Sequence, residues 1–453
     1  MVKPSLLRPP RAVVGAPLSG RCPDVPSAGG RNPRKRNPPP AANPFARRTL
    51  RAIPPRGPVL ASSLRVKRPA TVPCAFFDGP RPADPAWTPP YCPWDPCPSW
   101  RGRPFRWRRH GSFRTLAAPE PVRRFRCLAC GRTFSAKTFS GVYFAKRPDI
   151  LARLAEALAN GAGLRQAARG LPCARSTAVR AADRLGRLAA LASALILEGF
   201  PVAGPVAYDD FVSFALVQQL EVALGTSVDP ETSLLLGLSA APRLKGARWT
   251  PRQRARIPAL RAALPAGLPG RAFREHVDDL LRRTPPGAVL ELRSDDDPLF
   301  RANLARPRYA GRVRHRVFPA PPRRRAGPAY NRALGPANAL HQFLRHSDAG
   351  HRRETIAFDR RVASLVARAA LFQFWRDFVQ RRREALTDGP TPAMAAGLLA
   401  RPLSWDDLLA RRVFRRDLRV LPPLARRVLA RDFPTPTARD APRLFPRHWL
   451  ARA

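Results

Sequence analysis

The chain has 453 residues, more than one domain usually holds, and its 81 Lys and Arg against 32 Asp and Glu give a formal charge of +49. It contains no run of about 18 apolar residues and no compact apolar stretch near its first residue, so we expect neither a membrane span nor a secretory signal. Arginine supplies 75 of the 81 basic residues, and such an excess suits a polyanion such as nucleic acid. A GC-rich genome would also enrich Arg, Pro and Ala, so charge alone does not establish the partner.

The first predicted segment is a proline-rich and arginine-rich arm over residues 1–85. It contains only three acidic residues and has no sustained helical or strand periodicity, so it offers too little apolar surface to offset chain entropy. We expect this arm to be disordered. Two interpretations stay open: a basic arm that tethers DNA, or sequence that precedes the true start codon.

Two cysteine pairs predict a zinc ribbon over residues 86–145. The first pair is Cys92 and Cys97, the second is Cys127 and Cys130, and 29 residues separate them. Each pair can turn back on itself to place two thiolates on one ion, and four thiolates suit tetrahedral Zn²⁺. The alternative is that the cysteines are merely buried. In a reducing compartment this pattern favours metal over disulfides.

Residues 146–198 are predicted to form a helix-turn-helix made of three short helices. Leucines at 151, 154 and 158 mark one face of the first helix, residues 163–171 form the second, and the third begins near Ser176 and reaches Arg187. The third helix of such a unit lies in the major groove of DNA. We expect the residues that read DNA to be Arg175, Arg180 and Arg184. A plain helical linker is the alternative.

From residue 199 to residue 385 the sequence predicts an α/β domain with a mixed sheet and helices on its faces. Apolar runs broken by Asp, Pro and Gly predict strands, and these runs are residues 205–216, 220–228, 233–242, 288–294 and 311–318. A helical insert separates the third run from the fourth. This order is the ribonuclease-H-like succession. Residues 386–453 are predicted to be a C-terminal tail.

Acidic residues are scarce, so their position at strand ends is informative. Asp209 and Asp210 are expected at the end of the first predicted strand, and Asp295 at the end of the fourth. Phosphoryl transfer with two divalent ions needs carboxylates from separate elements, and Mg²⁺ or Mn²⁺ would be the cofactor. Glu354 is expected one turn before Phe358 on a helix that faces the sheet, whereas Asp359 is rotated about 100° away from that face. The alternative is that these acids are ordinary turn and cap residues.

Residues 90 to about 410 resemble bacterial insertion-sequence transposases of the zinc-ribbon, DDE kind. The matching segments are "CPWDPCPS", "RRFRCLACGRTFSAKTF", "YDDFVSF", "SDDDPLF" and "RHSDAGHRRETIAFDRR". The resemblance implies two-metal strand cleavage and transfer by a ribonuclease-H-like fold. It matches Asp209 to the first family aspartate, Asp295 to the second and the four ribbon cysteines to the zinc ligands. Some relatives carry the last glutamate where this chain has Ala363 rather than at Glu354.

The function expected from these features is transposition of an insertion element. The expected partner is double-stranded DNA, in particular terminal inverted repeats, bound by a homo-oligomer in the cytoplasm in association with the nucleoid. The alternative function is a catalytically inactive, domesticated DNA-binding regulator derived from a transposase. The presence of the third carboxylate is the sequence feature that distinguishes an active transposase from the inactive regulator.

Overall fold

The computed structural model describes most of the chain from residue 75 onward, and this part lies within one compact unit, Arg65–Ala453. The described residues are 75–101, 105–115, 118–244, 246, 249–319, 327–352, 355–382, 389–433 and 435–436. Residues 1–74 of the predicted arm lie outside them. The end of the arm is folded, which corrects the predicted boundary at residue 85: α1 (Ala75–Asp78) places Phe77 in the main hydrophobic core.

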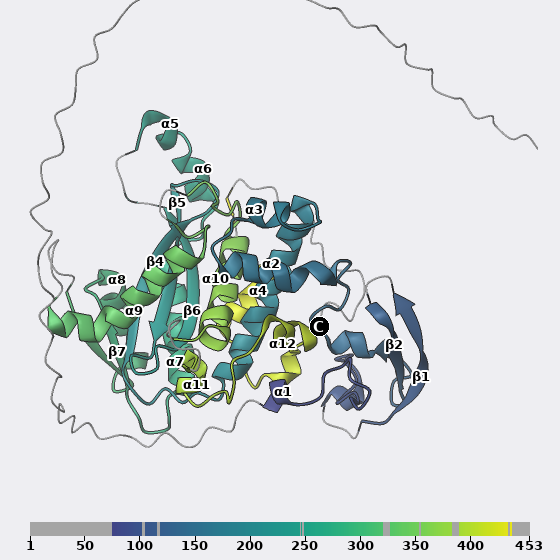
Figure 1. The fold of residues 1–453 in the computed structure, drawn as a ribbon. Coiled ribbons are helices and arrows are strands. Elements are labelled where there is room, and N and C mark those ends of the chain that lie inside the picture. Colours follow the sequence, from purple (N-terminus) through teal and green to yellow (C-terminus); the bar gives the residue numbers. More distant parts are fainter. Residues whose placement is uncertain are drawn as a thin grey trace, which may run out of the picture. The chain divides into compact units, whose positions relative to one another are not determined.

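The predicted ribbon segment contains a small antiparallel sheet with strand order β1-β2-β3 (Figure 1). The strands are β1 (Trp107–Thr115), β2 (Ala118–Cys127) and β3 (Thr133–Ser135), with short helices η1 (Pro98–Arg101) and η2 (Ala136–Phe139) beside them. Aromatic rings fill its core. Phe125 contacts Trp87 and Trp107, with ring centroids 5.9 and 5.1 Å apart. Rings supply much apolar area per residue, so a small, arginine-rich sheet can still have a core.

Three helices follow, as predicted, after the short η3 (Pro148–Ile150). They are α2 (Leu151–Ala159), α3 (Leu164–Arg169) and α4 (Arg175–Leu197), and both shorter helices pack on α4. The third helix ends at Leu197 rather than at Arg187 because its second half is rich in Ala and Leu, both strong helix formers, and is buried. Its Gly186 packs directly on Ala367 of a later helix, where a Cβ would lie 2.3 Å from the Ala367 carbonyl oxygen.

The second sheet is mixed and has five strands in the order β6-β5-β4-β7-β8, which confirms a mixed α/β architecture (Figure 1). The strands are β4 (Val206–Phe214), β5 (Leu220–Val228), β6 (Leu235–Leu244), β7 (Leu290–Ser294) and β8 (Val313–Val317). Strands β4, β5 and β6 pair antiparallel, whereas β4, β7 and β8 pair parallel. Each strand overlaps a predicted apolar run.

Helices cover both faces of this sheet at its central strand, β4. Successive side chains of a strand point to opposite faces. Tyr208 packs on Phe273 of α7 and Phe300 of α8, whereas its neighbour Ala207 packs among residues of α9. The helices after β6 are α5 (Pro251–Arg254), α6 (Ile257–Ala262), α7 (Leu268–Arg283), α8 (Pro298–Leu304), η4 (Pro307–Tyr309), α9 (Pro328–Ser347), α10 (Val362–Phe374) and η5 (Trp375–Val379). No helix in the described ranges is long and apolar enough to cross a membrane.

The predicted C-terminal tail contains short helices where the structure describes it, over residues 389–433. Its elements are α11 (Pro392–Ala395), α12 (Trp405–Ala410), η6 (Arg415–Asp417) and α13 (Pro423–Ala430). The Trp405 indole donates a 2.6 Å hydrogen bond to Glu156 of α2, and Phe414 is fully buried in the ribbon core. These short apolar segments bury their side chains against elements that are distant in the sequence. The local periodicity of the sequence therefore did not predict these helices.

The helix predicted to open near Glu354 begins later, which corrects the expected placement of that residue. α10 starts at Val362, and Arg361 before it is extended with a φ of −135°. The backbone N–H of Leu216 donates to the Asp359 carbonyl at 2.9 Å, which ties this part of the chain to the loop after β4. Residues 355–361 are not helical, so no helix continues through Phe358, and Glu354 itself lies outside the described residues.

A buried ion cluster holds both ends of the segment between α9 and α10. Arg368 of α10 is 2% exposed, contacts the carboxylate of Asp348 through Nη2 and Nε, and has its Nη1 3.8 Å from Asp359 Oδ2. Burial raises the pKa of Asp359 to about 7. Burial also acts to raise the pKa of Asp348, but the charges of Arg368 and His351 and the hydrogen bonds from Gly350 and Arg368 together lower it. The cluster is a tertiary contact that no local sequence pattern encodes.

Arg368→Ala should destabilise the fold by about 3–5 kcal/mol, because it leaves buried carboxylates without their cation. Urea unfolding followed by circular dichroism would measure the loss. Arg360→Ala is the matched control, since Arg360 is exposed on the same segment. Equal stability of the two variants would contradict a structural role for Arg368.

Candidate functional site

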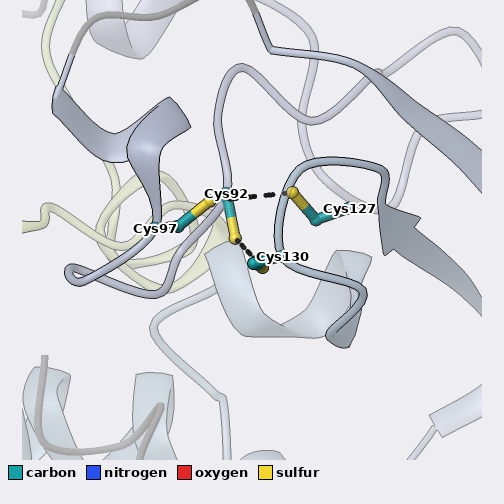
Figure 2. Close-up of side chains that lie close together, drawn as sticks. All are labelled: Cys92, Cys97, Cys127 and Cys130. Atoms are coloured by element: carbon teal, nitrogen blue, oxygen red, sulfur yellow. Dashed lines mark hydrogen bonds between the residues drawn. The ribbon is translucent and has the colours of Figure 1, made fainter.

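The four ribbon cysteines form one cluster (Figure 2). Cys92 Sγ lies 3.8 Å from Cys130 Sγ, Cys97 Sγ lies 3.7 Å from Cys127 Sγ, and all four sulfurs lie within 4.8 Å of one another. Thiolates about 2.3 Å from a tetrahedral Zn²⁺ are roughly 3.8 Å apart, whereas a disulfide needs about 2.05 Å. The cluster therefore fits one metal ion such as zinc and not disulfides.

Two turns bring the cysteines together, and each is closed by backbone hydrogen bonds. The N–H of Cys97 donates to the Trp94 carbonyl at 3.0 Å, which accommodates the wider spacing of the first pair. The N–H of Gly131 donates to the Cys127 carbonyl at 3.0 Å, and Gly131 has a φ of +71°. A residue with a side chain rarely adopts such a φ, which explains the glycine here.

The electrostatics of the cluster call for a cation. Burial raises the pKa of the Cys130 thiol to about 11 and raises that of Cys92 further. Four thiolates cannot share this space without a counter-charge, and a divalent ion deprotonates its thiol ligands. The predicted ligand set Cys92, Cys97, Cys127 and Cys130 is thus the set that the fold brings together.

Asp209 and Asp295 come from adjacent parallel strands at the centre of the larger sheet. Asp209 lies within β4, not at its end as predicted, and Asp295 directly follows β7, which pairs with β4 up to Ala207 and Arg293. The charge of Asp295 raises the pKa of both Asp209 and Asp210, so Asp295 lies near this part of β4. The two aspartates come from strands with a long insert between them in the sequence, so their proximity is a product of the fold.

Both carboxyl groups have pKa values above their ordinary range. Burial and the charge of Asp295 raise the pKa of Asp209 to about 7, although Arg345 acts against the shift. Burial, and next the charge of Asp297, also raises the pKa of Asp295. Oδ1 of Asp295 is buried and has no hydrogen-bond partner. Carboxylate oxygens are the ligands that Mg²⁺ and Mn²⁺ prefer, but among the described residues only the four ribbon cysteines form a group of three or more potential ligands close enough to share one ion.

The neighbouring acids have other roles. Tyr208 donates to Asp210 Oδ1 at 3.2 Å on the opposite face of β4, and burial raises the pKa of Asp210 to about 6. Asp296 pairs with Arg301, and Asp297 caps α8 by accepting a 2.7 Å hydrogen bond from the Leu299 N–H. The interpretation as turn and cap residues therefore holds for Asp297.

An open cleft lies beside Asp209, with α9 along one wall. It has a volume of about 510 Å³ and is lined by Asp209, Asp210, Tyr330, Asn331, Gly335, Asn338, Ala339, His341, Gln342 and Arg345. Asn331, Asn338, Gln342 and Arg345 follow one another along α9 at steps of seven, four and three residues, so they share one helical face. Sequence reasoning did not single out His341 or Arg345. The spacing of polar residues along one face of this helix was the available signal.

The remaining predicted ligand, Glu354, lies outside the described residues, although residues on both sides of it are placed. Thr355 Oγ1 donates to the Ala349 carbonyl at 2.7 Å, and Arg352 donates to the His346 carbonyl at 3.3 Å. Asp359, the nearby alternative acid, is 4% exposed and faces Arg368. Its carboxylate is therefore committed to the ion cluster between α9 and α10.

The three arginines predicted to read DNA differ in their surroundings. Arg175 and Arg180 are exposed near the start of α4. Arg184 is half-buried, and its Nη1 donates hydrogen bonds to the carbonyls of Gly141 and Tyr143 at 3.0 and 2.7 Å. Arg184 thus fastens the ribbon segment to α4, and we remove it from the residues expected to contact DNA.

Comparison with known proteins identifies no relative. No protein-family model matches the chain, and no curated protein matches it in sequence.

Proposed function

We propose that the protein is a DNA transposase of the zinc-ribbon, DDE kind, which cleaves DNA strands at the ends of an insertion element and joins them to target DNA. The observation that carries this proposal is that Asp209 of β4 and Asp295, directly after β7, come from adjacent parallel strands, with Asp209 lining a cleft and Asp295 Oδ1 unpartnered. Paired carboxylates on rigid strands are what metal-dependent phosphoryl transfer requires.

Strand order supports a ribonuclease-H-like fold for the catalytic domain. Three antiparallel strands, two parallel strands added beside the first, and helices on both faces are the succession that the resemblance implies. In this arrangement the central strand β4 and its parallel neighbour β7 carry the acidic ligands. The helix that follows the last strand, α9, borders them.

The proposed chemistry assigns distinct tasks to the residues of the cleft. Asp209 and Asp295 would hold Mg²⁺ or Mn²⁺, and such ions, when bound, would supply activation of the attacking oxygen and stabilisation of the leaving oxygen of the scissile phosphate. Arg345 lies above the ring of Phe211, with its guanidinium carbon 4.8 Å from the ring centroid, and lines the same cleft. An arginine in that place orients a phosphate through paired hydrogen bonds.

DNA binding is proposed to come from the ribbon and the three helices. Arg108 and Arg109 are exposed on β1, a strand whose residues are exposed on both faces. Arg175 and Arg180 are exposed on α4. A helix or a two-stranded ribbon fits the major groove of DNA. The proposed target is the terminal inverted repeat of the element, bound by a homo-oligomer in the nucleoid.

Arg180→Ala should weaken specific binding by roughly ten-fold or more, which corresponds to 1–3 kcal/mol, and should weaken non-specific binding less. Affinity of the parent should fall steeply as salt rises, because phosphate contacts release counterions. Fluorescence anisotropy with specific and scrambled duplexes at several salt concentrations would measure both. An equal loss of affinity for every DNA sequence would mean that Arg180 contacts the DNA backbone and not the bases.

A second candidate function is a DNA-binding regulator without catalysis. The observation that favours it is the pair of residues that α9 brings to Asp209: His341 and Arg345, and not a glutamate. A nearby guanidinium can neutralise carboxylates without a metal ion. In this case the ribbon and α4 would still bind DNA.

The test is strand transfer by the purified full chain with labelled DNA that flanks the gene, in Mg²⁺ or Mn²⁺. A transposase joins labelled ends to a target plasmid and is inactive in EDTA. Tight binding of the same DNA, with no cleavage under any metal condition, would support the regulator instead.

A further inference from the structure

The insert between β6 and α7 is a small helical unit with a restrained backbone. It contains α5 and α6 and spans residues 249–267. Thr250 caps α5 by accepting a hydrogen bond from the Gln253 N–H at 3.3 Å. Each helix has a proline in its first turn, and Pro265 follows α6. Because proline fixes its own φ, the insert loses little backbone freedom when it binds a partner.

One stripe of side chains attaches the insert to the rest of the fold. The backbone at Ala255 and Arg256 stays in the right-handed helical region, so α5 and α6 follow a nearly continuous helical path. Leu260 is 2% exposed, and Leu264 packs against the main hydrophobic core. Within residues 251–264, the positions that are not exposed recur at helical spacing: Gln253, Ile257, Leu260 and Leu264. The opposite side of the insert therefore faces solvent.

Exposed arginines form two rows beside this stripe. A helix turns by about 100° per residue, so Arg252 and Arg256, each one residue before a member of the stripe, share one flank. Arg254 and Arg261, each one residue after a member, share the other flank. All four are exposed, and the outward side between the rows consists of alanine and proline. The long arginine side chains can therefore reach past the short ones between them.

The charge of the two rows is not neutralised within the part of the chain that the structure describes. None of the four arginines is placed in an ion pair with a described carboxylate. The sequence contains no Asp or Glu between Glu231 and Glu275. Exposed arginines of the neighbouring segments differ, since Arg282 and Arg308 each pair with an aspartate. The insert thus presents uncompensated positive charge, which suits a polyanion.

A DNA duplex matches this arrangement. A helix fits the major groove, which is about 12 Å wide, and phosphate groups line both sides of that groove. Arginine forms paired hydrogen bonds with phosphate oxygens. Between the two rows the outward side offers no side chain that could form a hydrogen bond with a base edge. The contact would therefore be made to phosphates and would carry no sequence information.

We infer that the α5–α6 insert is a second DNA-binding surface, which holds the target duplex by the phosphates of both strands. The inference rests on the proposed function, because strand transfer requires a target duplex beside the cleaved ends. In that function the ribbon and α4 bind the ends. The insert, which reads no sequence, binds the target.

Two double variants test the two rows separately: Arg252→Gln with Arg256→Gln, and Arg254→Gln with Arg261→Gln. The measurement is the fluorescence anisotropy of a labelled random-sequence duplex bound by the zinc-loaded full chain at several salt concentrations. Each row variant should weaken binding by about five-fold or more and lower the slope of log affinity against log salt by about 2, since each phosphate contact contributes about 0.9. Circular dichroism should show that both variants keep the parent fold, because the stripe is unchanged.

Arg282→Gln with Arg308→Gln is the matched control. It removes the same charge from exposed arginines that pair with Asp279 and Asp278, and it should bind the duplex like the parent. Parent-like affinity and slope in both row variants would overturn the inference, and so would an equal loss in the control. Weaker binding to phosphatidylglycerol vesicles, with unchanged binding to DNA, would overturn it in favour of a membrane surface.

Plasmid nicking by the parent distinguishes a failure of this inference from a failure of the proposed function. Nicking by the parent, together with parent-like duplex binding by both row variants, rejects only the role of the insert. Weaker duplex binding by the row variants, with no nicking by the parent under any metal condition, rejects the transposase and leaves the insert as a DNA-binding surface.

Discussion

Replacement of Cys127 by Ser is expected to remove zinc from the ribbon and unfold its small core. Cys127 is fully buried at the end of β2, and its sulfur lies 3.7 Å from that of Cys97. A serine hydroxyl stays protonated and is a poor zinc ligand, and structural zinc sites contribute on the order of 10 kcal/mol to folding. Zinc content should fall from one equivalent to well under half, and residues 86–145 should become sensitive to protease.

Cys173→Ser is the matched control for this prediction. Cys173 is a half-buried thiol outside the four-cysteine cluster, so the variant should keep its zinc. Metal analysis of both proteins, prepared without chelators, would measure the difference. Parent protein with less than half an equivalent of zinc would contradict the ribbon assignment.

Asp209→Asn and Asp295→Asn are expected to abolish DNA cleavage while leaving DNA binding within about two-fold. Asn has the size of Asp without its charge, so the sheet should persist and the metal site should not. A loss of about 4 kcal/mol in transition-state stabilisation corresponds to a rate on the order of 10³-fold lower. Plasmid nicking with Mn²⁺ would measure the rate, and anisotropy would measure binding.

Asp296→Asn tests the specificity of this result. Asp296 is next to Asp295 in sequence, but its carboxylate pairs with Arg301, so the variant should nick DNA at the parent's rate. Glu354→Gln should resemble the Asp209 variant if Glu354 is the third carboxylate. Normal nicking by both Asp209→Asn and Asp295→Asn would leave the DNA-binding regulator as the better account.

Cleavage should also depend on pH through Asp209. Burial and the neighbouring Asp295 raise its pKa to about 7, so in the metal-free protein the carboxyl is largely protonated below that pH. A proton and a metal ion compete for the same oxygens. The Mn²⁺ concentration needed for half-maximal nicking should therefore rise as pH falls from 8 to 6. Independence of pH over this range would contradict a ligand role for Asp209.

Features with a local pattern were predictable from the sequence. Apolar runs located all five strands of the larger sheet, and paired cysteines located the four thiolates that the fold assembles. The position of Asp295 directly after a strand followed from the same runs, whereas Asp209, predicted at the end of a strand, lies within β4. Their adjacency needed the strand order, which the sequence only suggested through resemblance.

Features that depend on tertiary contacts were missed. The extended segment before α10 is held by Asp348, Asp359 and Arg368, and no local preference predicts that burial. The role of Arg184 depends on carbonyl groups some 40 residues away. A single histidine within a helix, such as His341, has no sequence signature that separates a core residue from one that lines a cleft.

Iron-directed cleavage of the polypeptide tests most directly whether Asp209 and Asp295 hold a metal ion in common, as we propose. Fe²⁺ bound in place of Mg²⁺ or Mn²⁺ generates hydroxyl radicals with ascorbate and peroxide, and these cut the backbone near the ion. The zinc-loaded protein should be cut near residues 209 and 295, and excess Mn²⁺ or Asp295→Asn should suppress both cuts. A chain that stays intact at these two positions while it binds DNA would contradict the claim.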